Sequence, residues 1–459
     1  MFKNFKKIHF VGIGGIGMSG IAEILLSQGF KISGSDKSLS EITQRLSELG
    51  VEIYEGHSRD NLKDVDVLVY SSAVSLDNPE IQAAIDRKIP VIKRAEMLAE
   101  CMRMKYGIGI AGTHGKTTTT SMIGLTLTEG ELDPTIIVGG KISGLGGTNA
   151  RLGNGEFIVV EADEFDRTFL KLTPTIAILT TLEKEHLDTY KDLEDIKTAF
   201  VEFANKTPFY GFVVLCLDEP ALQDIMPLIN KKIITYGTNP NADIKAINIK
   251  HDGFFSEYEV LRYEESLGKF KLRVPGLHNV KNSLAAIAVA YELGVDLEVI
   301  RKSLEKFTGV YRRFEVKYND DKFLVIDDYA HHPTEAAAVL SAIRSGWNRR
   351  VVAVFQPHLY SRTRDFYQEF ARVFLNSDVF VCLDVYPARE EPLPGINGEL
   401  IANTAKKFGH KKTFYEPDKT KLPDLLMELK NEGDIIVTMG AGDVWKYGEQ
   451  FVEKLKQEK

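Results

Sequence analysis

A glycine-rich stretch followed by a lysine and a run of threonines carries residue types that bind phosphates. It reads Gly112-Thr-His-Gly-Lys-Thr-Thr-Thr-Thr120. Glycines let the backbone come close to a ligand, and a helix N-terminus favours an anion. Lys116 adds a mobile charge, and the Thr117 hydroxyl suits a phosphate-bound Mg²⁺. A standard P-loop has glycine where Ile110 stands, so the stretch predicts a P-loop of non-standard form. The residues predicted to bind ATP here are Gly112, Thr113, His114, Gly115, Lys116, Thr117 and Thr118.

Acidic residues and a histidine follow the next two strands that the sequence predicts. Glu161 comes directly after a buried strand at 157–160, and His186 follows a strand at 175–180. Carboxylates at a strand end beside a P-loop are where a magnesium ligand belongs. We therefore expect Thr117, Glu161 and His186 to hold Mg²⁺. A solvated acidic loop and a structural histidine are the alternatives.

A second glycine run lies near the N-terminus. Gly12, Gly14 and Gly17 fit the G-x-G-x-x-G pattern after a predicted strand, and Asp36 follows the next strand. Alone, this pattern suggests an NAD enzyme. The extra Gly15 and the shortness of the unit favour a domain that holds a nucleotide diphosphate without hydride transfer. Glycines that only pack a helix on a strand are the alternative. The residues predicted to contact this second nucleotide are Gly14, Gly15, Ile16, Gly17, Asp36, Ser71 and Ser72.

His278 and Asn282 are spaced i, i+4 where a turn enters a helix predicted over 280–293. This spacing places both side chains on one helical face. Contact with a nucleotide base and capping of the helix both remain open at this point.

Strand ends in the last third of the chain collect charged residues. They are Asp328, His332, Arg362, Arg364, Arg389 and Asp443. Arginines can fork a carboxylate and stabilise a phosphoryl group, so we expect an anionic substrate group to bind there. A surface charge cluster is the alternative.

The elements that must position these residues alternate between buried strands, polar loops and helices. This order predicts an α/β fold with three domains: a Rossmann-like N-terminal domain, a central P-loop ATPase-like parallel sheet and a Rossmann-like C-terminal domain. We expect these domains to span residues 1–94, 95–313 and 314–459.

The composition narrows the class of protein. A chain of 459 residues is too long for one core, which agrees with several domains. Its formal net charge of −8 argues against a nucleic-acid binder, whose footprint is usually basic. Its three cysteines form no metal or disulfide pattern. There is no apolar run long enough for a bilayer and no signal peptide. We expect a cytoplasmic monomer or homodimer that binds small molecules.

A P-loop, a second anion site and a carboxylate clamp together suggest activation of a carboxylate by ATP. Electrostatic stabilisation would carry most of such a phosphoryl transfer. The chain also resembles the Mur ligases over nearly its whole length, and most closely the members that add alanine. The motifs that carry the resemblance are His9-Phe-Val-Gly-Ile-Gly-Gly-Ile-Gly-Met-Ser-Gly20, Gly112-Thr-His-Gly-Lys-Thr-Thr-Thr119, Glu161-Ala-Asp-Glu164, Glu185-His-Leu-Asp-Thr-Tyr190, Gly276-Leu-His-Asn279, Asp327-Asp-Tyr-Ala-His-His-Pro333 and Gln356-Pro-His-Leu-Tyr-Ser-Arg-Thr363.

The resemblance implies a reaction in peptidoglycan precursor synthesis. ATP phosphorylates the lactyl carboxylate of UDP-N-acetylmuramate, and the amine of L-alanine attacks the acyl phosphate. By the same resemblance, the first domain binds the UDP-sugar, the central domain ATP, and the last domain the amino acid. The residues implied to be catalytic are Lys116, His186, His332 and Arg362. His278, Asn282 and Asp328 are implied to contact ATP, and His332, Arg362 and Arg364 to contact the amino acid.

One position departs from the family pattern. Many relatives have arginine where Leu359 stands, which leaves open which arginine binds the amino acid carboxylate. A related ligase that joins a murein tripeptide to UDP-N-acetylmuramate is the nearest alternative function. A nicotinamide oxidoreductase leaves the Lys116 loop unexplained.

Overall fold

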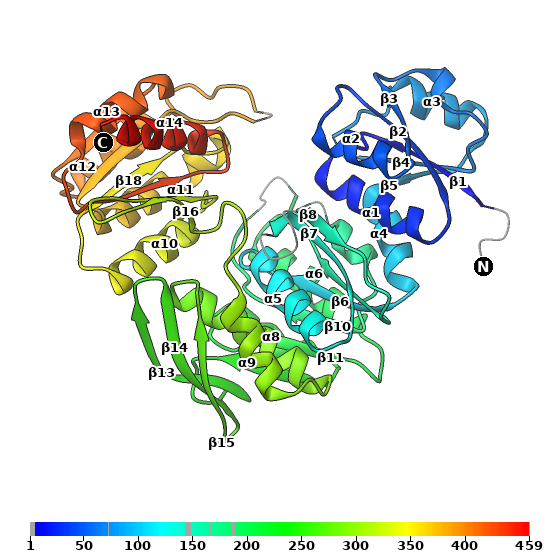
Figure 1. Ribbon diagram of the computed structural model, residues 1–459, viewed down its shortest axis with the longest axis horizontal. Coiled ribbons are helices and arrows are strands. Elements are labelled where there is room, and N and C mark those ends of the chain that lie inside the picture. Colours follow the sequence, from blue (N-terminus) through cyan, green and yellow to red (C-terminus); the bar gives the residue numbers. More distant parts are fainter. Residues whose placement is uncertain are drawn as a thin grey trace. The chain divides into compact units, whose positions relative to one another are not determined.

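The computed structural model describes residues 5–71, 73–142, 148–165, 167–185, 189–388 and 390–458. Three β-sheets and the helices that connect their strands make up this part of the chain (Figure 1). Two compact units contain them. The first consists of Met1–Asn248, Glu259–Phe270 and Lys281–Phe307, and the second of Ile249–Tyr258, Lys271–Val280 and Thr308–Lys459. None of the described helices has the length and apolar character needed to cross a membrane.

The N-terminal sheet is parallel and has the strand order β3-β2-β1-β4-β5. Its strands are β1 (Lys7–Val11), β2 (Lys31–Asp36), β3 (Glu52–Glu55), β4 (Val67–Tyr70) and β5 (Val91–Lys93), and its helices are α1 (Ile16–Ser27), α2 (Glu41–Glu48) and α3 (Pro79–Asp86). The strand order reverses between β1 and β4. Ligands of open α/β sheets bind at such a switch point, at the carboxyl ends of the strands. The glycine run that follows β1 lies at this point.

The central sheet has the order β15-β14-β13-β12-β11-β10-β6-β9-β7-β8. Its strands are β6 (Tyr106–Ala111), β7 (Thr135–Ile142), β8 (Thr148–Arg151), β9 (Phe157–Glu161), β10 (Ile176–Leu179), β11 (Phe212–Cys216), β12 (Ile233–Gly237), β13 (Ile244–Asp252), β14 (Phe255–Arg262) and β15 (Glu265–Leu272). The helices around it are α4 (Arg94–Arg103), α5 (Lys116–Glu129), α6 (Leu193–Asn205), α7 (Pro220–Ile225), α8 (Leu277–Glu292) and α9 (Leu297–Lys306). Strand β6 pairs in parallel with both β9 and β10, so three polar loops start side by side at its carboxyl end.

The C-terminal sheet has the order β16-β17-β21-β18-β19-β20, and only its β16–β17 pair is antiparallel among the described pairs. Its strands are β16 (Glu315–Asn319), β17 (Leu324–Asp328), β18 (Val351–Phe355), β19 (Val379–Leu383), β20 (Thr413–Glu416) and β21 (Ile435–Met439). Its helices are α10 (Pro333–Gly346), α11 (Tyr360–Val373), α12 (Gly398–Lys407), α13 (Leu422–Leu429) and α14 (Val444–Gln457).

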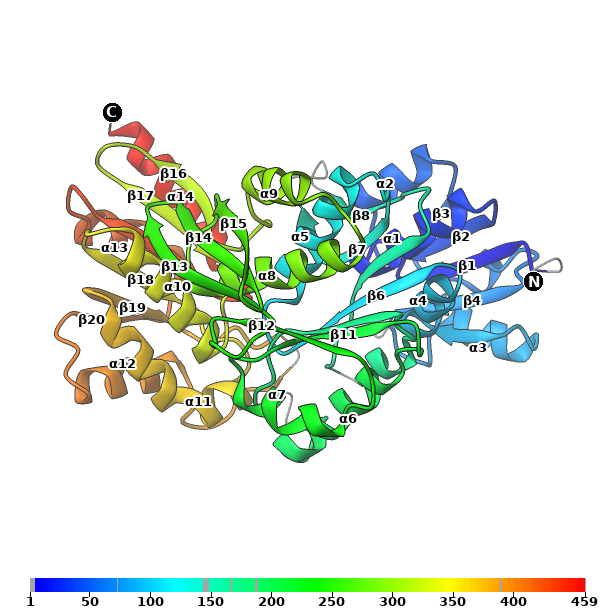
Figure 2. The same cartoon turned by 90° about the horizontal axis from the view of Figure 1, so that it is seen from below.

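Alternating strand residues divide the C-terminal core into two layers (Figure 2). Val351, Ala353 and Phe355 face α10, α11 and α12, whereas Val352 and Val354 face α13 and α14. Because both faces are covered, the central strands consist of continuous apolar runs and do not alternate with polar residues. The predicted α/β fold with three domains is confirmed, while the boundaries at 94 and 313 stay predictions.

Among the predicted elements whose bounds differ from the observed ones, a helix and a strand bear on the predicted site residues. Helix α8 begins at Leu277, earlier than predicted, because Gly276 takes a φ of 96° and its carbonyl accepts the N–H groups of Asn279 and Val280. Strand β2 continues to Asp36, which the sequence had placed after the strand, because Ser33–Asp36 pairs in parallel with β3. Strands β13, β14 and β15 were not predicted from the sequence.

Candidate active site

The loop between β6 and α5 needs glycine at two of its positions. Gly112 has a φ of 151° and Gly115 a φ of 81°, in the region that other residues rarely adopt. A Cβ on Gly112 would lie 1.9 Å from the Thr180 hydroxyl oxygen, and one on Gly115 would lie 2.7 Å from Oδ1 of Asn282. The loop therefore packs against β10's end and against α8, and it leads directly into the first turn of α5.

Lys116 is held by its own loop and by an acid from the neighbouring strand's loop. Its Nζ donates to the carbonyl oxygen of Gly112 at 2.6 Å and lies 2.8 Å from Oε2 of Glu164. Burial by itself would lower the pKa of Lys116, but the carboxylates of Glu164, Asp163 and Glu161 raise that pKa above its ordinary value. Lys116 is thus a fixed and largely buried positive charge at the N-terminus of α5.

A carboxylate and a hydroxyl lie beside this charge. The Thr117 hydroxyl donates to Oε1 of Glu161 at 2.9 Å, and the N–H of Gly139 donates to Oε2 at 2.7 Å. Burial raises the pKa of Glu161, whereas the nearby Lys116 lowers it, and the net shift is upward. The Thr117 hydroxyl oxygen and the Glu161 carboxylate oxygens are of the kind that Mg²⁺ prefers as ligands in proteins. The structure therefore brings together Lys116, Thr117 and Glu161 as the sequence predicts.

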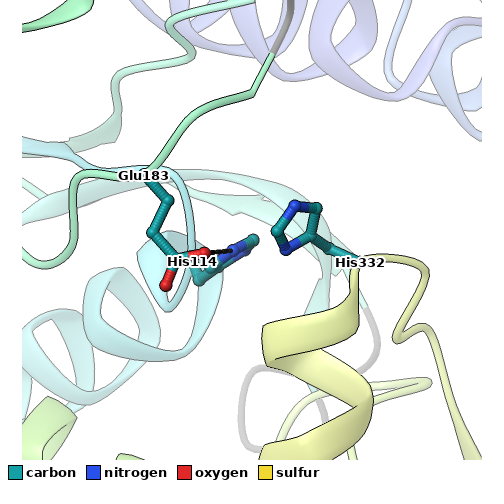
Figure 3. A group of neighbouring side chains, drawn as sticks. All are labelled: His114, Glu183 and His332. Atoms are coloured by element: carbon teal, nitrogen blue, oxygen red, sulfur yellow. Dashed lines mark ion pairs between the residues drawn. The ribbon is translucent and has the colours of Figure 1, made fainter. Parts of the chain in front are cut away.

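The base of the loop is fixed by two threonines that follow β10. The Thr180 hydroxyl donates to the carbonyl oxygen of His114 at 2.6 Å, and the His114 N–H donates to the Thr181 hydroxyl at 2.7 Å. His114 Nε2 lies 3.4 Å from Oε2 of Glu183, an ion pair that Figure 3 draws as a dashed line. His332, also drawn in Figure 3, belongs to the second unit.

Asn282 reaches the loop from α8. Its Oδ1 accepts the Thr119 hydroxyl at 3.2 Å, so Asn282 lies beside the first turns of α5, and its contact with ATP stays a prediction. His278 lies in the same helix, four residues earlier. His186 and Ser72, which the sequence assigns to the metal and to the UDP substrate, lie outside the described residues.

The N-terminal glycine run is held by the end of β2. The N–H groups of Gly12 and Ile13 donate to the Ser35 carbonyl at 2.8 and 3.0 Å, and the N–H of Gly14 donates to Oδ2 of Asp36 at 2.8 Å. Asp36, predicted to contact the nucleotide, therefore also supports the glycine loop. Ser71 follows β4, and its N–H donates to the Val11 carbonyl at 3.2 Å. Gly14, Asp36 and Ser71 thus lie together at the switch point.

A buried aspartate ends β17 in the second unit. Asp328 accepts the N–H of Phe314 at 2.7 Å and the N–H of Ala330 at 2.8 Å. Burial raises the pKa of Asp328 to about 6, although Arg313 lowers it. This carboxylate fixes the segment that joins α9 to β16.

The raised pKa makes stability depend on pH in a definite direction. A carboxyl whose folded pKa is raised stabilises the fold fully below its unfolded pKa, and this contribution is lost as pH rises through about 6. We expect the unfolding free energy of the wild type, relative to Asp328→Asn, to fall by about 3 kcal/mol between about pH 4 and about pH 7. Urea unfolding of both proteins across this range measures the difference. A constant difference would contradict the assignment.

The remaining candidates lie at the ends of β17 and β18. The His332 ring packs against Phe366 with centroids 5.0 Å apart. Arg362 Nη1 lies 3.2 Å from Nδ1 of His358, whose ring stacks on Tyr386. Arg364 makes two hydrogen bonds to Asp365, at 2.7 and 3.1 Å. Arg362 therefore contacts the His358 ring, whereas Arg364 pairs with the adjacent carboxylate.

Two acids have a larger role than the sequence analysis gave them. Glu164 pairs with Lys116, and its carbonyl accepts the buried Tyr190 hydroxyl at 2.7 Å. Glu335 accepts the N–H groups of His331 and His332, at 3.0 and 3.3 Å. Glu335 is the third residue of α10, after Pro333, and an acid at that position is a local signal for a helix start that could have identified it.

Comparison with known proteins shows that the chain is similar to the Mur ligases over most of its length. Three family profiles match in order: "Mur ligase family, catalytic domain" over residues 7–106, "Mur ligase middle domain" over 110–290, and "Mur ligase, glutamate ligase domain" over 312–442. The UDP-N-acetylmuramate–L-alanine ligase of Geotalea uraniireducens strain Rf4 is 52% identical, over 99% of both chains.

Solved structures of related ligases are also similar to the chain over nearly its whole length. The UDP-N-acetylmuramate-alanine ligase MurC of Thermotoga maritima superposes with a TM-score of 0.81 at 32% identity, over 99% of this chain and 100% of that chain. A murein peptide ligase from Psychrobacter arcticus superposes with a TM-score of 0.69 at 26% identity, over 98% of both chains. Both similarity measures are therefore higher for the alanine ligase.

Proposed function

Since the chain belongs to the Mur ligase family, we propose that it is an ATP-dependent ligase that joins L-alanine to UDP-N-acetylmuramate in peptidoglycan precursor synthesis. The observation that carries this is a 52% identity to an alanine ligase over 99% of both chains, together with the largely buried Lys116 at the start of α5. The murein tripeptide ligase alternative is less favoured, because two ligases of that kind are 26% and 31% identical, against 52% for the alanine ligase.

The reaction has two steps. The γ-phosphoryl group of ATP passes to the lactyl carboxylate, which gives an acyl phosphate and releases ADP. The amine nitrogen of alanine then attacks the acyl carbon. The tetrahedral intermediate loses phosphate and a proton and leaves the amide. Phosphoryl transfer needs little covalent chemistry from the protein, so positioning and electrostatics supply most of the catalysis.

Within this reaction, the loop after β6 binds the phosphates of ATP. Lys116 already lies fixed between a loop carbonyl and Glu164, so its charge requires little reorganisation when the phosphates arrive. The first turn of α5 offers N–H groups and the positive end of the helix dipole to the same phosphates. His278, Asn282 and Asp328 are proposed to contact the remainder of the nucleotide.

A magnesium ion fits the same place. Thr117 and Glu161 present a hydroxyl and a carboxylate oxygen within 2.9 Å of each other, a donor set that suits Mg²⁺. We assign both residues to the metal, with His186 as a further ligand. When bound, Mg²⁺ neutralises charge on the phosphate oxygens.

The flanking domains supply the two groups that are joined. Residues 1–94 are proposed to bind the UDP-sugar through the glycine loop after β1, with the central ATP domain at 95–313 and the amino-acid domain at 314–459. The three cysteines are buried and unpaired, which suits a reducing compartment such as the cytoplasm.

The amino acid carboxylate is assigned to Arg362. Arg362 is chosen because its guanidinium lies beside the His358 ring near the start of α11, whereas the Arg364 side chain is 56% exposed and pairs with the adjacent Asp365. We expect Arg362→Ala to raise the KM for alanine by about 10- to 100-fold, the value of a charge-assisted hydrogen bond. The KM for ATP should change little. His332→Ala should likewise raise the KM for alanine and change the KM for ATP little. Steady-state phosphate release with each substrate varied in turn measures both.

Two further arginine variants make this test selective. Arg364→Ala should raise the KM for alanine less than Arg362→Ala does. Arg372→Ala, near the end of the same helix and stacked over Phe408, should leave both constants unchanged. An equal rise in the KM for alanine and for ATP would remove Arg362 from the amino acid site.

The overall function is tested by phosphate release with UDP-N-acetylmuramate and ATP, with each amino acid or the murein tripeptide added in turn. Release that depends on L-alanine is expected. Release with the tripeptide alone would favour the alternative ligase.

A further inference from the structure

A fully buried carboxylate lies inside the N-terminal domain, away from its surface. Glu80 is the second residue of α3, and its exposed fraction is 0%. A buried charge is stable only when hydrogen bonds compensate for the lost hydration. The groups that surround Glu80 come from three other segments of the domain, which are separated in the sequence.

Each oxygen of Glu80 has two partners. Oε2 accepts the Ser35 hydroxyl at 2.5 Å and lies 3.1 Å from Nδ1 of His57. Oε1 accepts a hydrogen bond from Nδ2 of Asn61 at 2.5 Å, and it lies 3.6 Å from Nε2 of His9. The Glu80 carboxylate therefore connects β1, the end of β2 and the segment after β3.

The charge of Glu80 is supported by these partners. Burial by itself would raise the pKa of Glu80, but the nearby His9 imidazole and the hydrogen bonds from Ser35 and Asn61 lower it below its ordinary value. An ionised acceptor makes stronger hydrogen bonds than a neutral one, so the Ser35 hydroxyl is firmly held.

Ser35 is the residue that connects this network to the glycine loop. Its carbonyl accepts the N–H groups of Gly12 and Ile13 at 2.8 and 3.0 Å. The next residue, Asp36, accepts the N–H of Gly14 at 2.8 Å. The side chain of Ser35 thus faces Glu80 while its backbone fixes the loop.

We propose that Glu80 and Ser35 are positioning residues for the UDP-linked substrate, because together they hold the glycine loop in the conformation that receives the diphosphate. This inference rests on the proposed function of the first domain. Neither residue needs to touch the substrate. Loss of either hydrogen-bonding group would leave the reaction centre in the other domains intact.

The test measures binding of UDP-N-acetylmuramate to the full chain by isothermal titration calorimetry. Ser35→Ala and Glu80→Gln are each expected to raise the Kd about tenfold, roughly 1.4 kcal/mol. The kcat at saturating substrates and the KM values for ATP and alanine should stay at the wild-type level. Using two variants keeps the test decisive if Glu80→Gln fails to fold.

Ser27→Ala is the matched control. Ser27 is the last residue of α1 in the same domain, and its hydroxyl donates to the Ile24 carbonyl oxygen at 2.7 Å, outside the Glu80 network. It should keep the wild-type Kd. Wild-type Kd in Ser35→Ala and Glu80→Gln would overturn the inference, and so would an equal loss in all three variants that follows their thermal unfolding. Failure of the wild type to bind UDP-N-acetylmuramate would overturn the proposed function itself.

Discussion

Replacing Lys116 by alanine is expected to reduce alanine-dependent phosphate release by at least about 10²–10³-fold, the usual loss when one preorganised charge is removed from such a site. The side chain is 13% exposed, and its Nζ already bonds Gly112 and Glu164 at the helix start. No other described lysine shares this position, so nearby groups cannot replace its charge on the phosphates. A coupled phosphate assay at saturating substrates measures the loss.

A lysine at the opposite end of β6 provides the control. Lys105 immediately precedes β6, and its Nζ donates to the carbonyl oxygens of Gly153 and Gly155 at 2.7 and 2.9 Å. Lys105→Ala removes a lysine with a similar set of carbonyl partners at the opposite end of β6. It should lower stability and leave the kcat near the wild-type value. Activity retained in Lys116→Ala, with a folded protein by circular dichroism, would refute the proposed mechanism.

The second large effect is expected for Glu161→Gln. Both oxygens of Glu161 are used, one by the Thr117 hydroxyl and one by the Gly139 N–H, and an amide can accept at only one of its two atoms. The variant should lose about 10²–10³-fold in kcat and need a higher Mg²⁺ concentration for half-maximal activity. A magnesium titration at fixed ATP separates these two effects.

Glu156→Gln is a suitable companion variant, because Glu156 is exposed and directly precedes the same strand, β9. It should leave the magnesium dependence unchanged. If Glu161→Gln also keeps the wild-type magnesium dependence, Glu161 does not belong to the metal site, whatever the loss in kcat.

Features encoded in neighbouring residues could be predicted well. The strand, the glycine loop and the helix around Lys116 follow one another within a short segment, and each has a local cause. Apolar residues form the strand, Gly112 and Gly115 allow positive φ values, and threonines continue the helix. The glycine run before α1 was predictable for the same reason. Helix starts were less certain, as α8 shows, because they depend on the conformation of a single preceding glycine.

The partners of these residues could not be read from the sequence. Glu164 meets Lys116 because β9 pairs with β6, and Thr180 meets His114 because β10 pairs with β6 on its other side. Strand order in a parallel sheet is set by how crossover connections pack, and local residue patterns do not encode it.

The sequence by itself therefore determined the α/β class, the two glycine loops and the residue types of a phosphate site, because these depend on backbone conformation within a few residues. Only the tertiary structure decided which acid pairs with Lys116, how Asp328 is buried, and that Ser35 and Glu80 support the first glycine loop. Burial and charge pairing depend on contacts between distant segments, and such contacts exist only once the sheets have formed.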